Sequence, residues 1–507
     1  MDAQAINKNA TNSFEASNEQ KLKRSLGLKE GITITVGMVV GVGLFTVGAN
    51  CVGMMGSMII VATFVALLIS YWPALLYAEM GAALPFAGGT YNYAQKGTNR
   101  FFANLAGWNY IIGCISCCGG ETLAFSNYFT YFFKGIGIEI NVDPRIIAAI
   151  LLIVFVTINF RGVKLASKWQ NSCMFFFWAC SLVWFITMAP NINMENFLGG
   201  TLNAMPDAKS FITIVGLIWW CFAGFETAVG MGGEIKYPQI NIPRIMKVAP
   251  LFVFAITALF QWFLVGLVPG EFYEILQNAD APYAEGLISA GIVGFPLILL
   301  CFAIAFGGDL STINPGVGGP ARYIFQMSKE GCLPAFFSKI HPKYKTPYVA
   351  VLTVGIITLL LVSTNSIIYI ASLSLFAILF CYIIGFISFI GLRVKEKNLK
   401  RPYKAPAGIL GASVSIIIYF ILMTQIGTEA LVSGIIFCVI SITFYLVKTR
   451  IINVQTNDVD INELIEENSE VPSEEEAKKM KTEYKVWMAI GILLTIIALL
   501  AFIISYL

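Results

Sequence analysis

Three acidic residues lie inside long apolar stretches of the chain, where a charged side chain is costly to bury. They are Glu121 in CCGGETLAF, Glu226 in FAGFETAVG and Asp309 in FGGDLSTINPG. Acidic residues at such depth are by default candidates for handling a substrate, an ion or a proton. We favour a functional role for Glu226 and a structural one for Glu121. Asp309 stays open, because it could meet a cationic substrate group, bind a coupling ion with Ser311 and Thr312, or pair with a neighbouring helix.

Two of the apolar stretches are interrupted by glycine. One reads VGMVVGVGLF (36–45) and the other WWCFAGFETAVGMGGEI (219–235). Glycine weakens a helix by about 1 kcal/mol relative to alanine, and an unwound helix exposes N–H groups that hold a carboxylate and C=O groups that hold an ammonium group or a cation. Interrupted spans at matching places predict a binding site at the bilayer midplane. The alternative is close helix packing through small residues. The glycines are Gly37, Gly41 and Gly43 in the first stretch and Gly224, Gly230, Gly232 and Gly233 in the second.

The composition is that of a membrane protein. Of the 507 residues, 57% are hydrophobic and only 12% are charged, roughly half the charged fraction of a soluble protein. Most of the apolar stretches reach the ~20 residues of a spanning helix. The sequence therefore predicts an all-α polytopic membrane protein with about twelve core spans plus one more at the C-terminus. The stretches are 31–57, 58–84, 103–133, 145–160, 170–189, 210–233, 246–269, 286–313, 347–364, 366–391, 408–426, 430–448 and 486–507.

The basic residues predict the orientation. Lysines and arginines gather before the first span, which places the N-terminus in the cytoplasm. Threading the spans from there leaves only Lys134, Arg145 and Lys209 of the 33 basic residues on the outer side. We expect a cytoplasmic tail (1–30), a transporter domain (31–450), an acidic cytoplasmic linker (451–485) that is mostly disordered over 453–481, and an accessory transmembrane helix (486–507).

Other classes of chemistry find little support in the sequence. His341 is the only histidine, and Cys114, Cys117 and Cys118 lack the partners that a structural zinc site needs. Three scattered acids do not form the catalytic constellation of a membrane-embedded enzyme, and the linker is too short and polar to be the output domain of a sensor. We expect no catalytic activity, no cofactor, no metal and no nucleic-acid partner.

Several motifs resemble the amino acid–polyamine–organocation (APC) superfamily of transporters over about residues 28–450. YAEMGAALPFAGGTYNYAQ (77–95) resembles the signature after span 2, and VGVGLF resembles the glycine-rich break of span 1. NFRGVKLASKWQ (159–170) is similar to the entry into span 5. The stretch 222–244, the stretch 321–351 and RPYKAP (401–406) resemble span 6 and later cytoplasmic loops.

The resemblance implies a five-plus-five inverted-repeat fold, in which spans 1 and 6 are broken at equivalent positions, and alternating access to a central site. The backbone of span 1 would bind the substrate carboxylate and carbonyls of span 6 its amino group. Phe222 and Trp220 would be aromatic gates, and Glu226 matches a glutamate linked to gating or proton coupling. The implied substrate-binding residues are Val39, Val40, Gly41, Val42, Gly43, Trp220, Cys221 and Ala223, and the gating or coupling residues are Phe222, Glu226 and Asp309.

The sequence departs from the family in two places. Val42 replaces a common serine, and Phe177 stands where some proton-coupled relatives carry a lysine. The second departure favours exchange, or coupling through Glu226 or Asp309. Glu79 and Glu234 lie at cytoplasmic helix ends, where we expect them to pair with lysine or arginine.

We therefore predict a secondary transporter, a permease or an exchanger, for an amino acid in the cell membrane. An amine or polyamine carrier is the alternative. The expected partners are the small-molecule substrate, the lipid bilayer, a coupling ion (a proton or sodium) and, as an option left open, a second copy of the chain.

Overall fold

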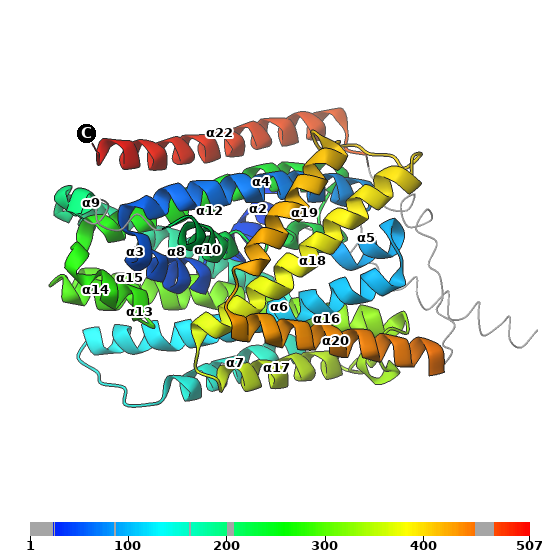
Figure 1. Ribbon diagram of the computed structural model, residues 1–507, viewed down its shortest axis with the longest axis horizontal. Coiled ribbons are helices and arrows are strands. Elements are labelled where there is room, and N and C mark those ends of the chain that lie inside the picture. Colours follow the sequence, from blue (N-terminus) through cyan, green and yellow to red (C-terminus); the bar gives the residue numbers. More distant parts are fainter. Residues whose placement is uncertain are drawn as a thin grey trace, which may run out of the picture.

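The structure, a computed structural model, describes residues 24, 26–85, 88–161, 164–199, 207–451 and 471–506. Apart from one isolated backbone bridge, between Leu26 and Ile235, the regular structure of these residues is entirely helical (Figure 1). Nine helical segments of the described chain are long and apolar enough to cross a membrane, and three shorter apolar helices accompany them. The longest segment, Gly43–Ala83, turns at Gly56 (φ 60°) and contains the second part of predicted span 1 and nearly all of span 2. The structure thus confirms an all-α polytopic protein.

The first half of the chain contains spans 1 to 5. Span 1 is divided into α2 (Leu28–Gly37), a π-helical turn η1 (Gly43–Gly48) and α3 (Ala49–Met55), so it is broken where the glycines predict. A short helix, α5, follows span 2. The remaining helices are α4 (Ile59–Ala83), α5 (Gly89–Gly97), α6 (Arg100–Gly135), α7 (Pro144–Arg161), α8 (Lys164–Met188) and α9 (Glu195–Gly199).

Span 6 is broken as well, into α10 (Ala208–Trp220) and α11 (Thr227–Gly230). Span 8 continues through a second π-helical turn, η5 (Ala303–Asp309), between α15 (Phe295–Phe302) and α16 (Leu310–Lys329). Such π-helical turns often mark functional positions in a helix. The other helices are α12 (Pro238–Leu267), α13 (Tyr273–Asn278), α14 (Pro282–Ser289), α17 (Tyr348–Val362), α18 (Ile367–Lys395), α19 (Gly408–Thr424), α20 (Thr428–Ile451) and α22 (Glu474–Ile504).

Local signals set where several of these helices begin. The side chain of Asn99 accepts a hydrogen bond from the Phe102 N–H at 3.1 Å and caps α6, and Asp207 caps α10 through the Ser210 N–H at 2.9 Å. Such caps satisfy N–H groups that have no partner inside the helix. Inside the bundle, α6, α12 and α18 are mostly buried, whereas α7, α17, α19 and α20 expose many isoleucines, leucines and valines, as lipid-facing helices do.

The last helix begins earlier than the sequence suggested. α22 starts at Glu474 with a capping box formed by Ser473 and Glu476, so residues 474–485 are helical. The prediction of disorder over 453–481 is therefore wrong for residues 474–481. The capping box satisfies backbone N–H groups of the first turn, which stabilises the start of the helix in this polar stretch. Residues 452–470 of that linker and residues 1–23 of the predicted tail lie outside the described residues. α22 packs along α12 at the edge of the bundle (Figure 1).

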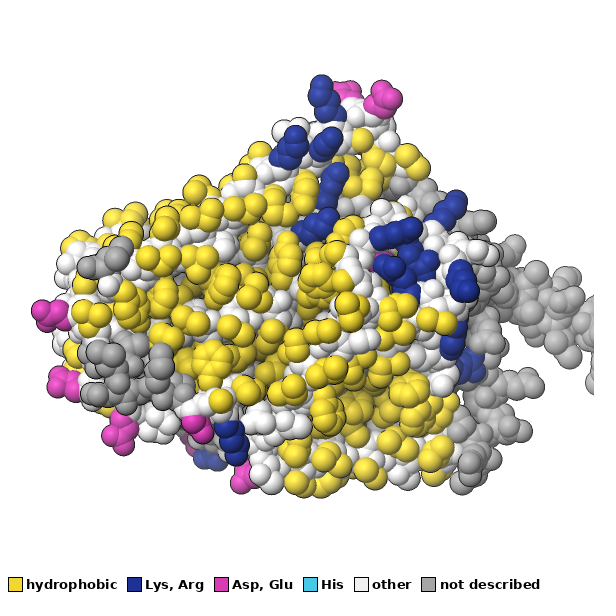
Figure 2. Space-filling view, turned by 45° about the horizontal axis from the view of Figure 1, so that its top comes forward, with side chains coloured by type: hydrophobic (Ala, Val, Ile, Leu, Met, Phe, Trp, Pro, Cys, Tyr) yellow, Lys and Arg dark blue, Asp and Glu magenta, His cyan; other side chains and the backbone are white. Residues whose placement is uncertain are grey.

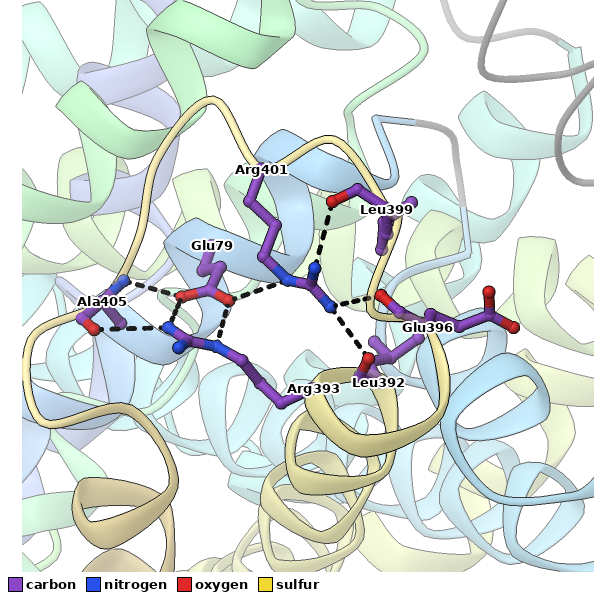
Figure 3. Close-up of polar contacts among 7 residues, drawn as sticks. All are labelled: Glu79, Leu392, Arg393, Glu396, Leu399, Arg401 and Ala405. Atoms are coloured by element: carbon purple, nitrogen blue, oxygen red, sulfur yellow. Dashed lines mark hydrogen bonds and ion pairs between the residues drawn. The ribbon is translucent and has the colours of Figure 1, made fainter.

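The charged side chains are divided between the two ends of the bundle. Figure 2 shows an apolar face with most lysines and arginines toward one end and most acidic side chains toward the other. At the basic end, Glu79 of α4 is buried and accepts hydrogen bonds from the Arg393 Nε at 2.7 Å and from the Ala405 N–H at 2.7 Å (Figure 3). Arg401 lies 3.3 Å from the same carboxylate. This cluster ties the loop 396–407 to the end of α4 and confirms the predicted pairing of Glu79.

Candidate functional site

A central cavity lies between the two broken helices and α6. The empty space between its walls, part of which is open to solvent, is about 600 Å³. Among its lining residues, none is a lysine, arginine or histidine. The cavity is lined by Met38, Val39, Gly43, Tyr110, Gly113, Cys114, Cys117, Glu121, Trp220, Ala223, Gly224, Glu226, Thr227, Thr312, Gly316, Ser374 and Ile378.

The break of span 1 is capped by an acidic side chain from α6. Glu121 is buried, and its Oε2 accepts a hydrogen bond from the backbone N–H of Val42 at 2.9 Å. A Cβ atom at position 41 would collide with the Glu121 carboxylate, so Gly41 is needed for this close approach. The carboxylate lies next to the N-terminal end of η1, where the helix dipole favours negative charge. One N–H group predicted to hold a substrate carboxylate is therefore occupied by a carboxylate of the protein.

The break of span 6 is held by α18. Gly224 has a positive φ of 111°, which lets the chain turn between α10 and α11. The hydroxyl of Tyr382 donates to the buried carboxylate of Glu226 and accepts a hydrogen bond from the Gly224 N–H at 3.3 Å. The two breaks also touch each other directly, because the Cys221 thiol donates to the Gly43 carbonyl at 2.9 Å.

Trp220 is fixed as a wall of the cavity. Its indole N–H donates to the Ser374 hydroxyl at 3.1 Å, and Ser374 donates in turn to the Gly113 carbonyl at 2.8 Å. The Trp220 carbonyl accepts the Ala223 N–H at 3.0 Å, which closes the turn after α10. The C-terminal end of α10 thus points its carbonyls toward the region where the sequence places the amino group of a substrate.

Asp309 lies behind Glu121 as seen from the cavity. Its side chain is fully buried, and apart from the Glu121 carboxyl group no described residue offers its oxygens a hydrogen bond. The Asp309 and Glu121 carboxyl groups interact electrostatically. A buried charge without a partner is strongly unfavourable, so this pair does not hold two negative charges at once.

The residues predicted from sequence divide into two groups. In one group, the side chain of Asp309 and the backbone of Val40 and Val42 lie behind the cavity, and Cys221 connects the break of span 1 to that of span 6. Phe222 lines a second, smaller cavity with Thr35, Phe225 and Val253 rather than the central one, so its role as a gate stays a prediction. The predicted residues that line the central cavity are Val39, Gly43, Trp220, Ala223 and Glu226.

Sequence reasoning missed most of the α6 wall. Tyr110, Cys114, Cys117 and Glu121 recur at spacings of three and four residues, which places them on one face of a helix. That spacing was visible in the sequence, but in a span that is apolar on all sides it did not say which face meets the cavity. Ser374 carries no local signal, whereas Thr312 is singled out in the sequence by its place beside Asp309.

Phe177 occupies an apolar position against span 8. It is fully buried, and its ring lies 5.6 Å from that of Phe45 and 6.0 Å from that of Phe260. A Cβ atom at Gly307 of η5 would lie 2.7 Å from the Phe177 Cβ atom. At this position α8 therefore has an apolar side chain that packs against span 8, and not a basic group.

Comparison with known proteins agrees with this architecture. The pattern of the amino acid permease family matches residues 26–447. The branched-chain amino acid permease BcaP of Bacillus subtilis (strain 168) is 24% identical over 466 residues, 86% of this chain and 95% of BcaP. The glutamate/serine transporter AimA of the same organism is 28% identical over 78% of this chain and 77% of its own. Cationic amino acid transporter 8, vacuolar, of Arabidopsis thaliana is 24% identical over 82% of this chain and 69% of its own. The chain belongs to the amino acid permease family.

Proposed function

We propose that the protein is a secondary transporter that moves an amino acid across the membrane by alternating access, with the central cavity as its substrate site. The observation that carries the proposal is the position of the cavity, between the N-terminal end of η1 and the C-terminal end of α10. These two helix ends attract opposite charges, and an amino acid carries both charges within one small group of atoms.

In this proposal the carboxylate binds at the backbone of Val42 and Gly43, and the amino group binds at the carbonyls that follow Trp220. The substrate side chain then points toward α6 and α18, where Cys114, Cys117 and Ile378 line the cavity. This wall is apolar and weakly polar, which favours a small or medium-sized neutral side chain. Glu226 lies at the moving break of span 6 and is the candidate for gating.

Transport is assigned to residues 31–450, with α22 as an accessory helix. The basic end of the bundle in Figure 2 would face the cytoplasm, in accord with the tendency of lysine and arginine to stay on that side. The N-terminal tail would then be cytoplasmic. Exchange is the favoured mode of transport unless a carboxyl group of the cavity couples it to protons.

The experiment that tests the proposal is uptake of radiolabelled amino acids into proteoliposomes that contain the purified protein. A mixture of proteinogenic L-amino acids is offered with and without the same mixture preloaded inside. We expect uptake well above that of protein-free vesicles. The variant Gly43→Val fills the gap beside Cys221 and should abolish uptake, while Gly427→Ala, in a loop with free space around the glycine, should leave it unchanged. No uptake under either condition would refute the proposal.

A second candidate is transport of an amine that has no carboxylate. One observation favours it. Glu121 already accepts the hydrogen bond of the Val42 N–H group, and the cavity that Glu121 and Glu226 line has no basic side chain among its lining residues. Labelled putrescine and tyramine, offered in parallel, distinguish the two. An amine carrier would take up these compounds, and an excess of neutral amino acids would not compete.

A further inference from the structure

We infer that Glu121 is a built-in competitor of the substrate carboxylate and couples transport to proton entry. In the empty site the Glu121 carboxylate accepts the Val42 N–H hydrogen bond. When the substrate carboxylate takes that N–H group, Glu121 is displaced and binds a proton. This inference rests on the proposed transport of an amino acid and adds the coupling ion and the residue that carries it.

The geometry at the break makes the competition direct. A single N–H group, that of Val42, points at the Glu121 carboxylate, and Glu121 itself lines the cavity. Val42 itself is buried behind the cavity wall, so a substrate carboxylate that enters from the cavity reaches this N–H group only where Glu121 moves aside. A carboxylate at a helix N-terminal end is stabilised by the hydrogen bond and by the dipole, so the displaced Glu121 loses both of these stabilising interactions together.

The surroundings offer the displaced carboxylate no other charge partner. Asp309 interacts with it from the side away from the cavity, electrostatically and through a hydrogen bond between the two carboxyl groups, and no other described residue donates to its carboxyl oxygens. Two carboxyl groups in one buried site do not both ionise. The pair therefore holds one proton, on Asp309, while Glu121 caps the helix, and two protons once the substrate has displaced Glu121.

The other titratable groups near the pair do not take over this role. Cys117 and Cys118 of α6 face Glu121, and Tyr128 faces Asp309. Thiols and phenols are ordinarily neutral below about pH 8. Across the cavity, Glu226 is held by Tyr382. No lysine, arginine or histidine lines the cavity in the described part of the chain, so the proton that balances the substrate carboxylate goes to Glu121.

The step is balanced in charge and atoms. One proton from the side of higher proton concentration converts the Glu121 carboxylate to the neutral acid, and no covalent bond to the substrate forms or breaks. A neutral zwitterion and one proton then cross together. On release, the N–H group of Val42 becomes available, Glu121 loses its proton to the opposite side and caps the helix again.

The test measures protons and substrate in the same proteoliposomes. The vesicles enclose a pH-sensitive dye, and the probe is the labelled mixture of proteinogenic L-amino acids. We expect wild-type protein to acidify the interior when the mixture is added outside and to accumulate label when the outside is more acidic. Exchange of label without acidification would overturn the inference and leave the proposed function standing. Absence of any amino acid uptake or exchange would refute both, and uptake of putrescine or tyramine alone would assign Glu121 to an amine carrier.

Two variants separate the roles of the paired acids. Glu121→Gln can still accept the Val42 hydrogen bond but cannot bind a proton, so it should keep exchange while acidification falls below about one tenth of wild type. Asp309→Asn removes the proton that the pair holds in the empty site but keeps Glu121 as the group that binds the second one, so acidification should stay well above that of Glu121→Gln. Glu274→Gln, at an exposed residue of α13, is the control for replacing a glutamate by a glutamine. Acidification by Glu121→Gln at the wild-type rate would overturn the inference.

A binding measurement keeps the inference testable if Glu121→Gln does not fold. Because binding takes up one proton, the affinity of wild-type protein for the amino acid mixture should rise as pH falls, by up to about tenfold per pH unit. Affinity that does not change with pH would overturn it.

Discussion

The hydroxyl group of Tyr382 donates a hydrogen bond to the carboxylate of Glu226 and at the same time accepts one from the Gly224 N–H at 3.3 Å. One side chain of α18 therefore holds both sides of the break in span 6. Because this break must change shape if the cavity opens to alternate sides, the Tyr382–Glu226 pair links the position of α18 to the substrate site.

Removal of this hydroxyl should impair transport without unfolding the protein. In Tyr382→Phe, the buried Glu226 carboxyl and the Gly224 N–H lose a partner, which costs about 1–3 kcal/mol, or about 5- to 150-fold in an equilibrium. We expect the rate of amino acid exchange in proteoliposomes to fall within that range. Tyr369→Phe, which removes a hydroxyl bonded to Ser433 on the same helix, should exchange at the wild-type rate. Equal rates for both variants would show that the pair has no part in transport.

Loss of Arg393 should destabilise the basic end of the bundle. Arg393→Met leaves the buried Glu79 carboxylate with Arg401 and the Ala405 N–H. Because Arg401 still compensates the charge, the cost stays below the about 3–5 kcal/mol of an uncompensated buried charge. Thermal unfolding in detergent, followed by fluorescence-detected size-exclusion chromatography, should show a clear fall in the transition temperature. Arg145→Met removes an arginine from an exposed pair with Asp143 and should leave the transition where it was. A similar shift in the two variants would mean that burial of the Glu79 cluster adds nothing to stability.

The contact between η5 and α8 should not tolerate a larger residue. In Gly307→Ala, the new methyl group would lie 2.7 Å from the Phe177 Cβ atom and 2.9 Å from its Cα atom. Backbone must move to relieve such a contact, and overpacking costs about 1–3 kcal/mol. We expect a lower yield of folded protein and slower exchange. Because the clash involves the Phe177 backbone, Phe177→Ala added to Gly307→Ala should restore little of either, whereas full rescue by that double variant would show that only the ring is in the way.

The accessory helix should matter for stability more than for binding. α22 is fixed to the bundle near both of its ends, where the Trp262 indole N–H donates to the Ser505 hydroxyl at 2.7 Å and the Tyr237 hydroxyl donates to Glu476 at 3.0 Å. None of its residues lines the central cavity. A chain ended after residue 470 should keep the substrate affinity of the full chain and unfold at a lower temperature. A large loss of affinity in a folded truncated protein would give α22 a direct role in the transport cycle.

The local features of the sequence were sufficient for the architecture. The length and hydropathy of each apolar stretch determine whether it can cross a membrane, and the glycines around Gly41 and Gly224 determine where a span can unwind, because both properties depend on residues adjacent in the chain. The same holds for the start of α22 at Ser473, whose capping box was present in the sequence although the polar composition that follows it suggested a linker.

Only the tertiary structure decided what the acidic residues do. Glu121 and Val42 are separated by 79 positions in the chain, and nothing near either residue announces their hydrogen bond. Asp309 lies behind Glu121 rather than in the cavity, and Phe222 faces a different cavity from Trp220, although both belong to the same broken span. The rotation of each helix about its own axis sets which side chains meet. That rotation follows from packing against several other helices at once, so it is a property of the whole bundle and cannot be found in any one stretch of sequence.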